Sequence, residues 1–156
     1  SLTVRDVATT RQPLRVVVDS KLEILPTARI LQGEPVLIVG AVENVDKMAL
    51  LRSTGNFVEI LNNGSGKVDL KALLEMLAQR GINEVHAEAG FKLNGSLLRE
   101  GLVDELLLYL APCLIGHDAS GLFNLPELTM LDGKKPLKIR DLRQIGEDIR
   151  LIARFP

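Results

Sequence analysis

Two short β-branched runs, at residues 14–20 and 35–40, are largely apolar before their last residues, and a third apolar run follows at residues 57–61. The first run stops at the polar pair Asp19 and Ser20. A strand that is apolar on both faces is typical of a parallel sheet covered by helices, because a half-exposed strand alternates apolar and polar side chains. The pattern therefore predicts parallel strands inside an α/β domain.

Helical patterns separate these runs. Asn44 or Asp46 is placed to cap a short helix that stops near Gly55. The clearest helix lies between Asp69, at the position of an N-cap, and Gly81, at the position of a C-cap. Its apolar stripe follows the spacing i, i+3, i+4 and i+7 and comprises Leu70, Leu73, Leu74 and Leu77.

The second half of the chain changes its pattern toward the end. We expect a strand at 84–88, a loop at 90–96 that runs into a helix, and an apolar, central strand at 104–112. Alternating segments at 137–144 and 149–155 carry the signature of a hairpin. Together these elements predict a single α/β domain with three layers, a mostly parallel mixed sheet and a C-terminal antiparallel hairpin.

Charge and composition exclude several classes of function. The net charge is -1 and only 3% of residues are aromatic, so neither a basic surface nor stacking side chains invite nucleic acid. No apolar run reaches the length of a spanning helix and no leader pattern opens the sequence, so we expect a soluble, cytoplasmic protein without a membrane partner. Cys113 is the only cysteine, which excludes an intrachain disulfide.

The histidines do not point to catalysis or to a metal. His86 lies in the expected strand 84–88, where we predict a packed core side chain, and His117 lies in a turn where we predict solvation. Neither stands at a zinc-ligand spacing from Cys113, so no metal site is expected.

The glycine-rich segment 90–96 is the strongest candidate for chemistry. Gly90 and Gly95 permit positive φ and a close backbone approach, and a helix N-terminus after them favours an anion such as a pyrophosphate. The segment lacks the lysine of a Walker A motif and is not a G-x-G-x-x-G fingerprint. A plain strand-to-helix turn has the same pattern and remains open. Glu88, directly before the segment, is placed to accept hydrogen bonds from a polar substrate, and Ser20 ends a neighbouring strand.

Several segments, in this order, resemble the C-terminal reductase domain of the bacterial bifunctional riboflavin-biosynthesis deaminase/reductase. They are Leu2-Thr3-Val4-Arg5, residues 13–20, Glu88-Ala89-Gly90 through Gly95-Ser96-Leu97-Leu98, and residues 101–105 through 110–112, continuing into 114–116. Each segment alone is unspecific, whereas the ordered combination spans nearly the whole chain.

The resemblance implies a dihydrofolate-reductase-like fold, NADPH as the hydride donor, and a pyrimidine substrate with a phosphoribosylamino group. It assigns Leu2, Arg5 and Glu88 to the substrate, with Arg5 on its phosphate. It assigns NADPH to Ser20 and to the loop made of Gly90, Phe91, Lys92, Leu93, Asn94, Gly95 and Ser96. The family usually has proline and threonine where Phe91 and Lys92 stand here, a difference that bears on the geometry of the loop.

The resemblance also implies that part of the site precedes Ser1. In the family, the segment before Leu-Thr-Val-Arg supplies a strand and a helix, further NADPH contacts and an acidic residue proposed to assist catalysis, and a zinc deaminase domain precedes the reductase. We therefore expect a fragment whose catalytic residues lie upstream and whose sheet edge is covered by a partner, a homodimer being the expected assembly. The alternatives are a non-catalytic nucleotide-binding domain and a structural domain whose glycine loop is only a turn.

Overall fold

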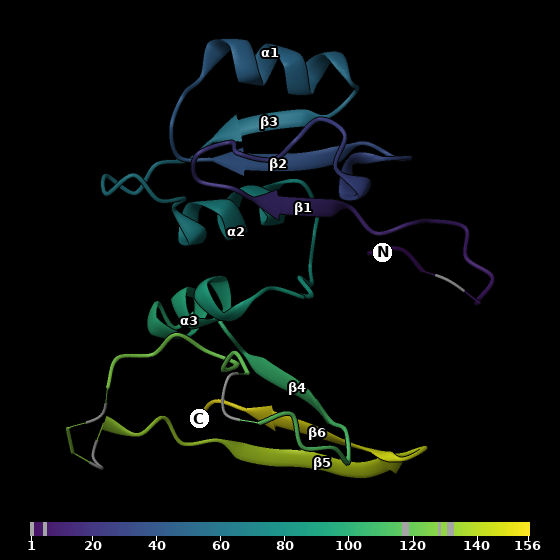
Figure 1. Cartoon of the computed structure of the whole chain (residues 1–156), viewed down its shortest axis with the longest axis vertical. Helices are drawn as coiled ribbons and strands as arrows, with labels where there is room; N and C mark the ends of the chain where they lie inside the picture. Colours follow the sequence, from purple (N-terminus) through teal and green to yellow (C-terminus); the bar gives the residue numbers. More distant parts are fainter. Residues whose placement is uncertain (1, 5, 117–118, 128, 131–132) are drawn as a thin grey trace. The chain divides into compact units, whose positions relative to one another are not determined.

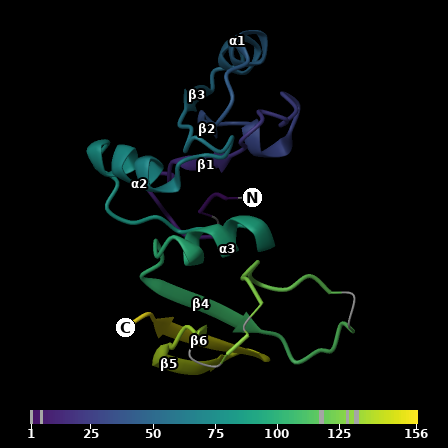
Figure 2. The same cartoon turned by 90° about the vertical axis from the view of Figure 1, so that its left-hand side faces the viewer.

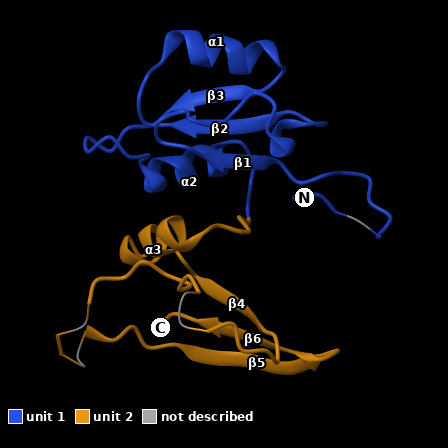
Figure 3. Cartoon of the chain, viewed as in Figure 1, with its two compact units in different colours: residues 1–83 blue, residues 84–156 orange. Residues whose placement is uncertain are grey.

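A computed structural model describes the chain except for residues 1, 5, 117–118, 128 and 131–132. The chain divides into two compact units, residues 1–83 and residues 84–156 (Figure 3). Each unit is described by itself below.

Unit 1 is built on a parallel sheet with the strand order β1-β2-β3 (Figure 1). The strands are β1 (Arg15–Val18), β2 (Val36–Gly40) and β3 (Phe57–Ile60), as the apolar runs predict. Every residue of the central strand β2 is buried. The order in the sheet follows the order in the chain, so each crossover joins neighbouring strands.

Helices cover both faces of this sheet (Figure 2). Helix α1 (Val45–Ser53) and the 3-10 turn η1 (Arg29–Leu31) lie on one face, and α2 (Leu70–Gln79) lies on the other. The core on the α1 face comprises Leu22, Leu31, Val36, Ile38, Met48, Leu51 and Val58. Successive β2 side chains serve opposite faces, which explains why the strand is apolar throughout.

Both predicted caps are confirmed. The Asn44 side chain accepts a hydrogen bond from the Lys47 N–H at 3.0 Å, which selects Asn44 over Asp46 as the N-cap of α1. The Asp69 carboxylate accepts one from the Ala72 N–H at 2.9 Å. Gly81 takes a positive φ of 79° after the C-cap of α2, a conformation that glycine adopts without strain.

Unit 2 contains α3 (Phe91–Arg99) and an antiparallel sheet with the strand order β4-β6-β5. The strands are β4 (Glu105–Leu110), β5 (Lys138–Ile145) and β6 (Asp148–Arg154). The predicted hairpin is confirmed: β5 and β6 pair from Ile145↔Asp148 onward, across a turn in which Gly146 has a φ of 62°. The α/β class, with parallel strands first and an antiparallel hairpin last, is also confirmed, although the described strands form two separate sheets.

Several local predictions about unit 2 are wrong. Residues 84–88 form no strand: Val85 is 49% exposed, and three of the five side chains there are polar. His86 is accordingly exposed and not a packed core residue. The strand predicted as central, β4, pairs among the described strands only with β6 and so lies at an edge of its sheet.

The described helices are all too short or too polar to cross a lipid bilayer.

Candidate functional site

The carboxyl ends of the parallel strands in unit 1 are joined through Ser20. Its carbonyl oxygen accepts hydrogen bonds from the N–H groups of Ala41 at 2.9 Å and Val42 at 3.1 Å. Its hydroxyl oxygen accepts one from the Val68 N–H at 3.3 Å. Ser20 thus connects the ends of β1 and β2 to the segment that follows β3. This edge is where ligands of open α/β sheets bind.

Gly40 lies where this edge of the sheet has little room for a side chain. A Cβ atom at Gly40 would lie 2.9 Å from Leu22 Cδ2 and 3.1 Å from Ile60 Cδ1, closer than side-chain carbons pack. The absence of a side chain therefore lets the ends of the strands pack closely beside Ser20. The structure thus brings Ser20 and Gly40 together at this edge.

The glycine-rich segment 90–96 belongs to unit 2 and has a different conformation from the one predicted. Gly90 is the N-cap of α3 with φ −85° and ψ 175°, so it does not use positive φ. Residues from Phe91 onward are helical, so the predicted loop is the N-terminal part of the helix. The physical reason is that Phe91, Leu93 and Asn94 are all tolerated in a first turn, and Asn94 anchors it by donating from Nδ2 to the Ala89 carbonyl at 2.9 Å.

The N-terminus of α3 keeps the property for which it was singled out. No side chain among the described residues caps its first N–H groups, and its first turn contains no acidic residue. Lys92 lies exposed in that turn. Unpaired N–H groups, the positive end of the helix dipole and a lysine together favour an anionic group.

Gly95 is needed for a close backbone approach, as predicted, but to the chain itself. A Cβ atom there would lie 2.3 Å from the Asn124 carbonyl oxygen and 2.7 Å from the Asn124 nitrogen. The Asn124 N–H donates to the Phe91 carbonyl at 3.0 Å, and Arg99 Nη1 donates to the Asn124 carbonyl. The helix therefore holds the segment around Asn124 against its side.

Glu88 lies exposed just before α3. Its Oε1 atom is 3.6 Å from His86 Nε2, and the side chains are 58% and 64% exposed. An exposed carboxylate two residues before an uncapped helix N-terminus is free to accept hydrogen bonds from amino groups of a ligand. Unit 2 thus places Glu88 and residues 90–96 next to each other, as the sequence predicts.

Leu2 borders a cavity of about 540 Å³ in unit 1, together with Thr3, Arg15, Arg29, Ile30 and Gln32. Arg15 is buried and donates from Nη1 to the carbonyls of Ile30 at 2.7 Å and Gln32 at 3.1 Å. The Arg15 side chain therefore holds the η1 segment against β1 through hydrogen bonds. The predicted phosphate ligand Arg5 lies outside the described residues.

The sequence analysis missed an ion-pair cluster on the antiparallel sheet of unit 2. Asp141 accepts from Arg150 Nη2 at 2.7 Å and from Arg143 Nε at 2.8 Å. Its hydrogen bond with Arg150, followed by the one with Arg143, holds the pKa of Asp141 below its usual range. The hydrogen bond with Asp141 in turn raises the pKa of Arg150. The signal was one carboxylate, Asp141, two residues before Arg143 on one arm of the predicted hairpin, with Arg150, which faces Arg143, on the other arm.

The chain has sequence relatives along most of its length. The model of the RibD C-terminal domain family matches residues 1–151. The riboflavin biosynthesis protein RibD of Haemophilus influenzae is 41% identical over 142 residues, which cover 90% of this chain and 37% of that protein. The 5-amino-6-(5-phosphoribosylamino)uracil reductase of Buchnera aphidicola is 34% identical over 142 residues, covering 91% of this chain and 67% of that protein.

The fold has solved counterparts as well. A structure of Acinetobacter baumannii RibD superposes with a TM-score of 0.83 at 30% identity, covering 99% of this chain and 42% of that one. The chain thus spans less than half the length of the RibD proteins it matches.

Proposed function

The chain belongs to the RibD C-terminal domain family, and we propose that it carries out the reductase step of riboflavin biosynthesis. The reaction is the NADPH-dependent reduction of the ribosyl group of 5-amino-6-(5-phosphoribosylamino)uracil to a ribityl chain. The observation that carries this proposal is the match of the family model over residues 1–151, which spans both units and supports one reductase domain. The Buchnera relative, named for this reaction, is similar over two thirds of its own length.

NADPH is the proposed cofactor, and it would supply the hydride when bound. The N-terminus of α3 fits a pyrophosphate, because its first N–H groups have no side-chain cap and Lys92 adds a positive charge. We assign this contact to the residues of the predicted loop, Gly90, Phe91, Lys92, Leu93, Asn94, Gly95 and Ser96. Ser20 is assigned to NADPH as well, through the polar edge of the parallel sheet.

The proposed substrate contacts are Leu2, Arg5 and Glu88. The Glu88 carboxylate would accept hydrogen bonds from the amino groups of the pyrimidine and so fix the orientation of its ribosyl arm. Arg5 would hold the phosphate through two parallel N–H donors. The task of these residues is to position the sugar carbon at the hydride donor.

The second candidate, a nucleotide-binding domain without turnover, is separated from the first by two measurements on this chain. Titration with NADPH, followed by its fluorescence, should give a saturable change; a flat titration contradicts both candidates. Loss of NADPH absorbance with the phosphoribosylaminouracil substrate then tests turnover. Binding without oxidation of NADPH favours the second candidate when it is found in a protein that also carries the upstream segment in which the catalytic residues are expected.

The role of Glu88 has a matched control in the same segment. The change Glu88→Gln should weaken binding of the pyrimidine by roughly tenfold and leave NADPH binding nearly unchanged, because it removes a charged acceptor from the substrate alone. Glu84→Gln, another exposed glutamate, should change neither affinity. Equal losses for both ligands in Glu88→Gln would contradict the assignment.

A second copy of the chain is the proposed partner. The sheet of unit 2 exposes large apolar side chains that a partner would cover: Leu107, Tyr109, Leu110, Ile139, Leu142, Ile145 and Ile149 are 40–60% exposed. Light scattering after size exclusion should give twice the chain mass of 17.1 kDa. A monomer at micromolar concentration contradicts this part of the proposal.

A further inference from the structure

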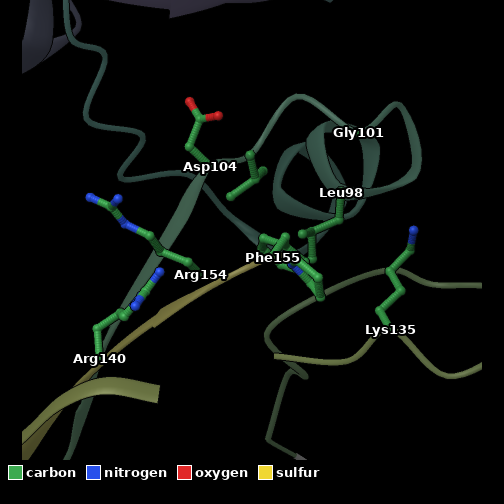
Figure 4. A pocket seen from close by; sticks show the side chains of 9 residues that line it. Leu98, Gly101, Asp104, Lys135, Arg140, Arg154 and Phe155 are labelled. Atoms are coloured by element: carbon green, nitrogen blue, oxygen red, sulfur yellow. The ribbon is translucent and has the colours of Figure 1, made fainter. Parts of the chain in front are cut away.

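Unit 2 contains a cavity of about 730 Å³ that none of the proposed substrate or cofactor residues lines. It lies between the end of α3 and the start of β4 on one side and the strands β5 and β6 on the other (Figure 4). Its volume falls in the range of sites for small organic ligands. Three cations, Lys135, Arg140 and Arg154, border it against one carboxylate, Asp104.

The backbone places Arg140 in this cavity by a distortion of the sheet. The pairing of β5 with β6 shifts register between Ile139 and Asp141, so Arg140 is the extra residue of a β-bulge. A bulge interrupts the alternation of side chains and redirects the extra one. Without the bulge, regular alternation would place Ile139 and Asp141 on the same face of the sheet. Here they pair with Ala153 and Ile152, two successive residues of β6, and therefore lie on opposite faces.

The cations of the cavity have unused hydrogen-bond donors. Arg154 donates from Nε to Glu105 Oε2 at 2.9 Å, which leaves its terminal nitrogens for another acceptor. Among the described residues, Arg140 and Lys135 have neither an ion pair nor a side-chain hydrogen bond. Figure 4 shows the guanidinium groups of Arg140 and Arg154 at the same end of the cavity. Two like charges held together are stabilised by an anion between them.

The remaining wall is apolar. Leu98 is only 6% exposed, and Phe155 lines the cavity beside it. A cation pair next to an aromatic and an aliphatic side chain suits a ligand with a charged end and an apolar ring.

We propose that this cavity binds a small organic phosphate, with the phosphate on Arg140 and Arg154 and the organic part against Phe155 and Leu98, beyond which Lys135 lines the opposite end of the cavity. A phosphate monoester offers three acceptor oxygens, which match the free donors of the two guanidinium groups. The site is independent of the proposed reductase function, because it shares no residue with it.

The test is a titration of the whole chain, followed by NMR, with adenosine 5′-monophosphate and with inorganic phosphate at constant ionic strength. We expect saturable shifts of the backbone amides of Gly101, Val103 and Arg140, with the nucleotide binding more tightly than phosphate. The double variant Arg140→Gln/Arg154→Gln should weaken binding of the nucleotide by at least roughly tenfold, since two charge-assisted contacts are lost.

A control of equal charge lies in the same segment. Lys134→Gln/Lys138→Gln removes two exposed lysines that do not line the cavity, and it should bind as the unchanged chain does. Arg140→Lys, which keeps the charge, should recover part of the affinity and checks that the loss is not a folding defect. Shifts that do not saturate, equal losses in both double variants, or equal affinity for inorganic phosphate and the nucleotide would each overturn the proposal.

Discussion

The two units bury their apolar side chains to different extents. In unit 1, every residue of β2 is buried and the largest fully buried side chains are Leu37, Ile38, Leu51, Val36 and Val39. In unit 2, the buried hydrophobic side chains among the described residues are Leu98 and Ala153, and β5 is exposed at all positions but one. Helices on both faces bury a parallel sheet, whereas a sheet with one helix leaves much of its surface uncovered.

The difference indicates two sources of stability. Unit 1 depends on apolar area removed from water. Unit 2 depends more on strand pairing, on ion pairs such as Arg150–Asp141 and on the contact of Gly95 with Asn124. The following substitutions test this comparison.

The largest effect is expected in the core of unit 1. Ile38→Ala should lower the free energy of unfolding by about 2–5 kcal/mol, because Ile38 is fully buried and its truncation leaves a cavity. Leu142→Ala in unit 2, at a side chain 60% exposed, should cost about 0.5 kcal/mol or less. Hydrogen exchange of the amides of each unit, measured at increasing urea concentrations, gives the loss of unfolding free energy for both variants. A large cost for Leu142→Ala would mean that its side chain is covered in solution.

A smaller loss is expected from the closest packing in unit 2. Gly95→Ala should cost about 1–3 kcal/mol, since a methyl group would meet the Asn124 backbone and force the two segments apart. Gly90→Ala is the matched control, because a Cβ atom there meets nothing within 4 Å. The exchange protection of unit 2 amides should fall in the first variant alone. Equal protection in both variants would show that the Asn124 segment moves without cost.

The helix caps should give an effect of about 1 kcal/mol. Asp69→Ala removes the side-chain cap of α2 and should destabilise unit 1 by about that amount. Gly90→Ser should add a few tenths of a kcal/mol, roughly, to unit 2, because α3 has no side-chain cap. Thermal unfolding of the two variants should shift in opposite directions. A stabilised Asp69→Ala would contradict the assignment of the cap.

The smallest effect is a pH dependence confined to unit 2. The pKa of Asp141 is lower in the folded chain than in the unfolded one, so its ion pairs stabilise unit 2 above the ordinary carboxyl pKa of about 4. This contribution is lost as the pH falls through the lowered pKa. Asp141→Asn should therefore reduce the melting temperature slightly at pH 7 and less at pH 3. Glu147→Gln, in the hairpin turn, should show no such difference; a constant deficit for Asp141→Asn at all pH values would exclude the ionic origin.

Sequence patterns predicted the elements whose causes are local. The β2 run, the Asp69 cap and the β5–β6 hairpin depend on neighbouring residues, and all three were predicted. The edge position of β4 depends on which distant strand pairs with it, and the leucines of β4 would suit a central or an edge strand equally well. The conformation of residues 91–96 was missed because glycine and asparagine are compatible with both a loop and a first helical turn.

The candidate site also has features that the sequence could predict and features that it could not. The adjacency of Glu88 to the glycine segment follows from the chain itself and was predictable. The cation cavity was not, because the bulge at Arg140 changes the alternation that a period of two residues would give. Its members also come from three segments that only the folded sheet brings together.

The strand order of unit 2 affects how the chain can fold while it is being synthesised on the ribosome. β4 finds its partner in β6, so residues 111–137 and the whole of β5 must be made before the sheet can close. The parallel sheet of unit 1 is complete in sequence at Ile60, roughly 90 residues earlier. At ribosomal speeds of about 5–20 residues per second, unit 1 has several seconds to fold first. The leucines of β4 are made about half-way through that interval and stay unpaired until β6 is complete. The β5–β6 hairpin then forms within microseconds, and β4 can pair with it.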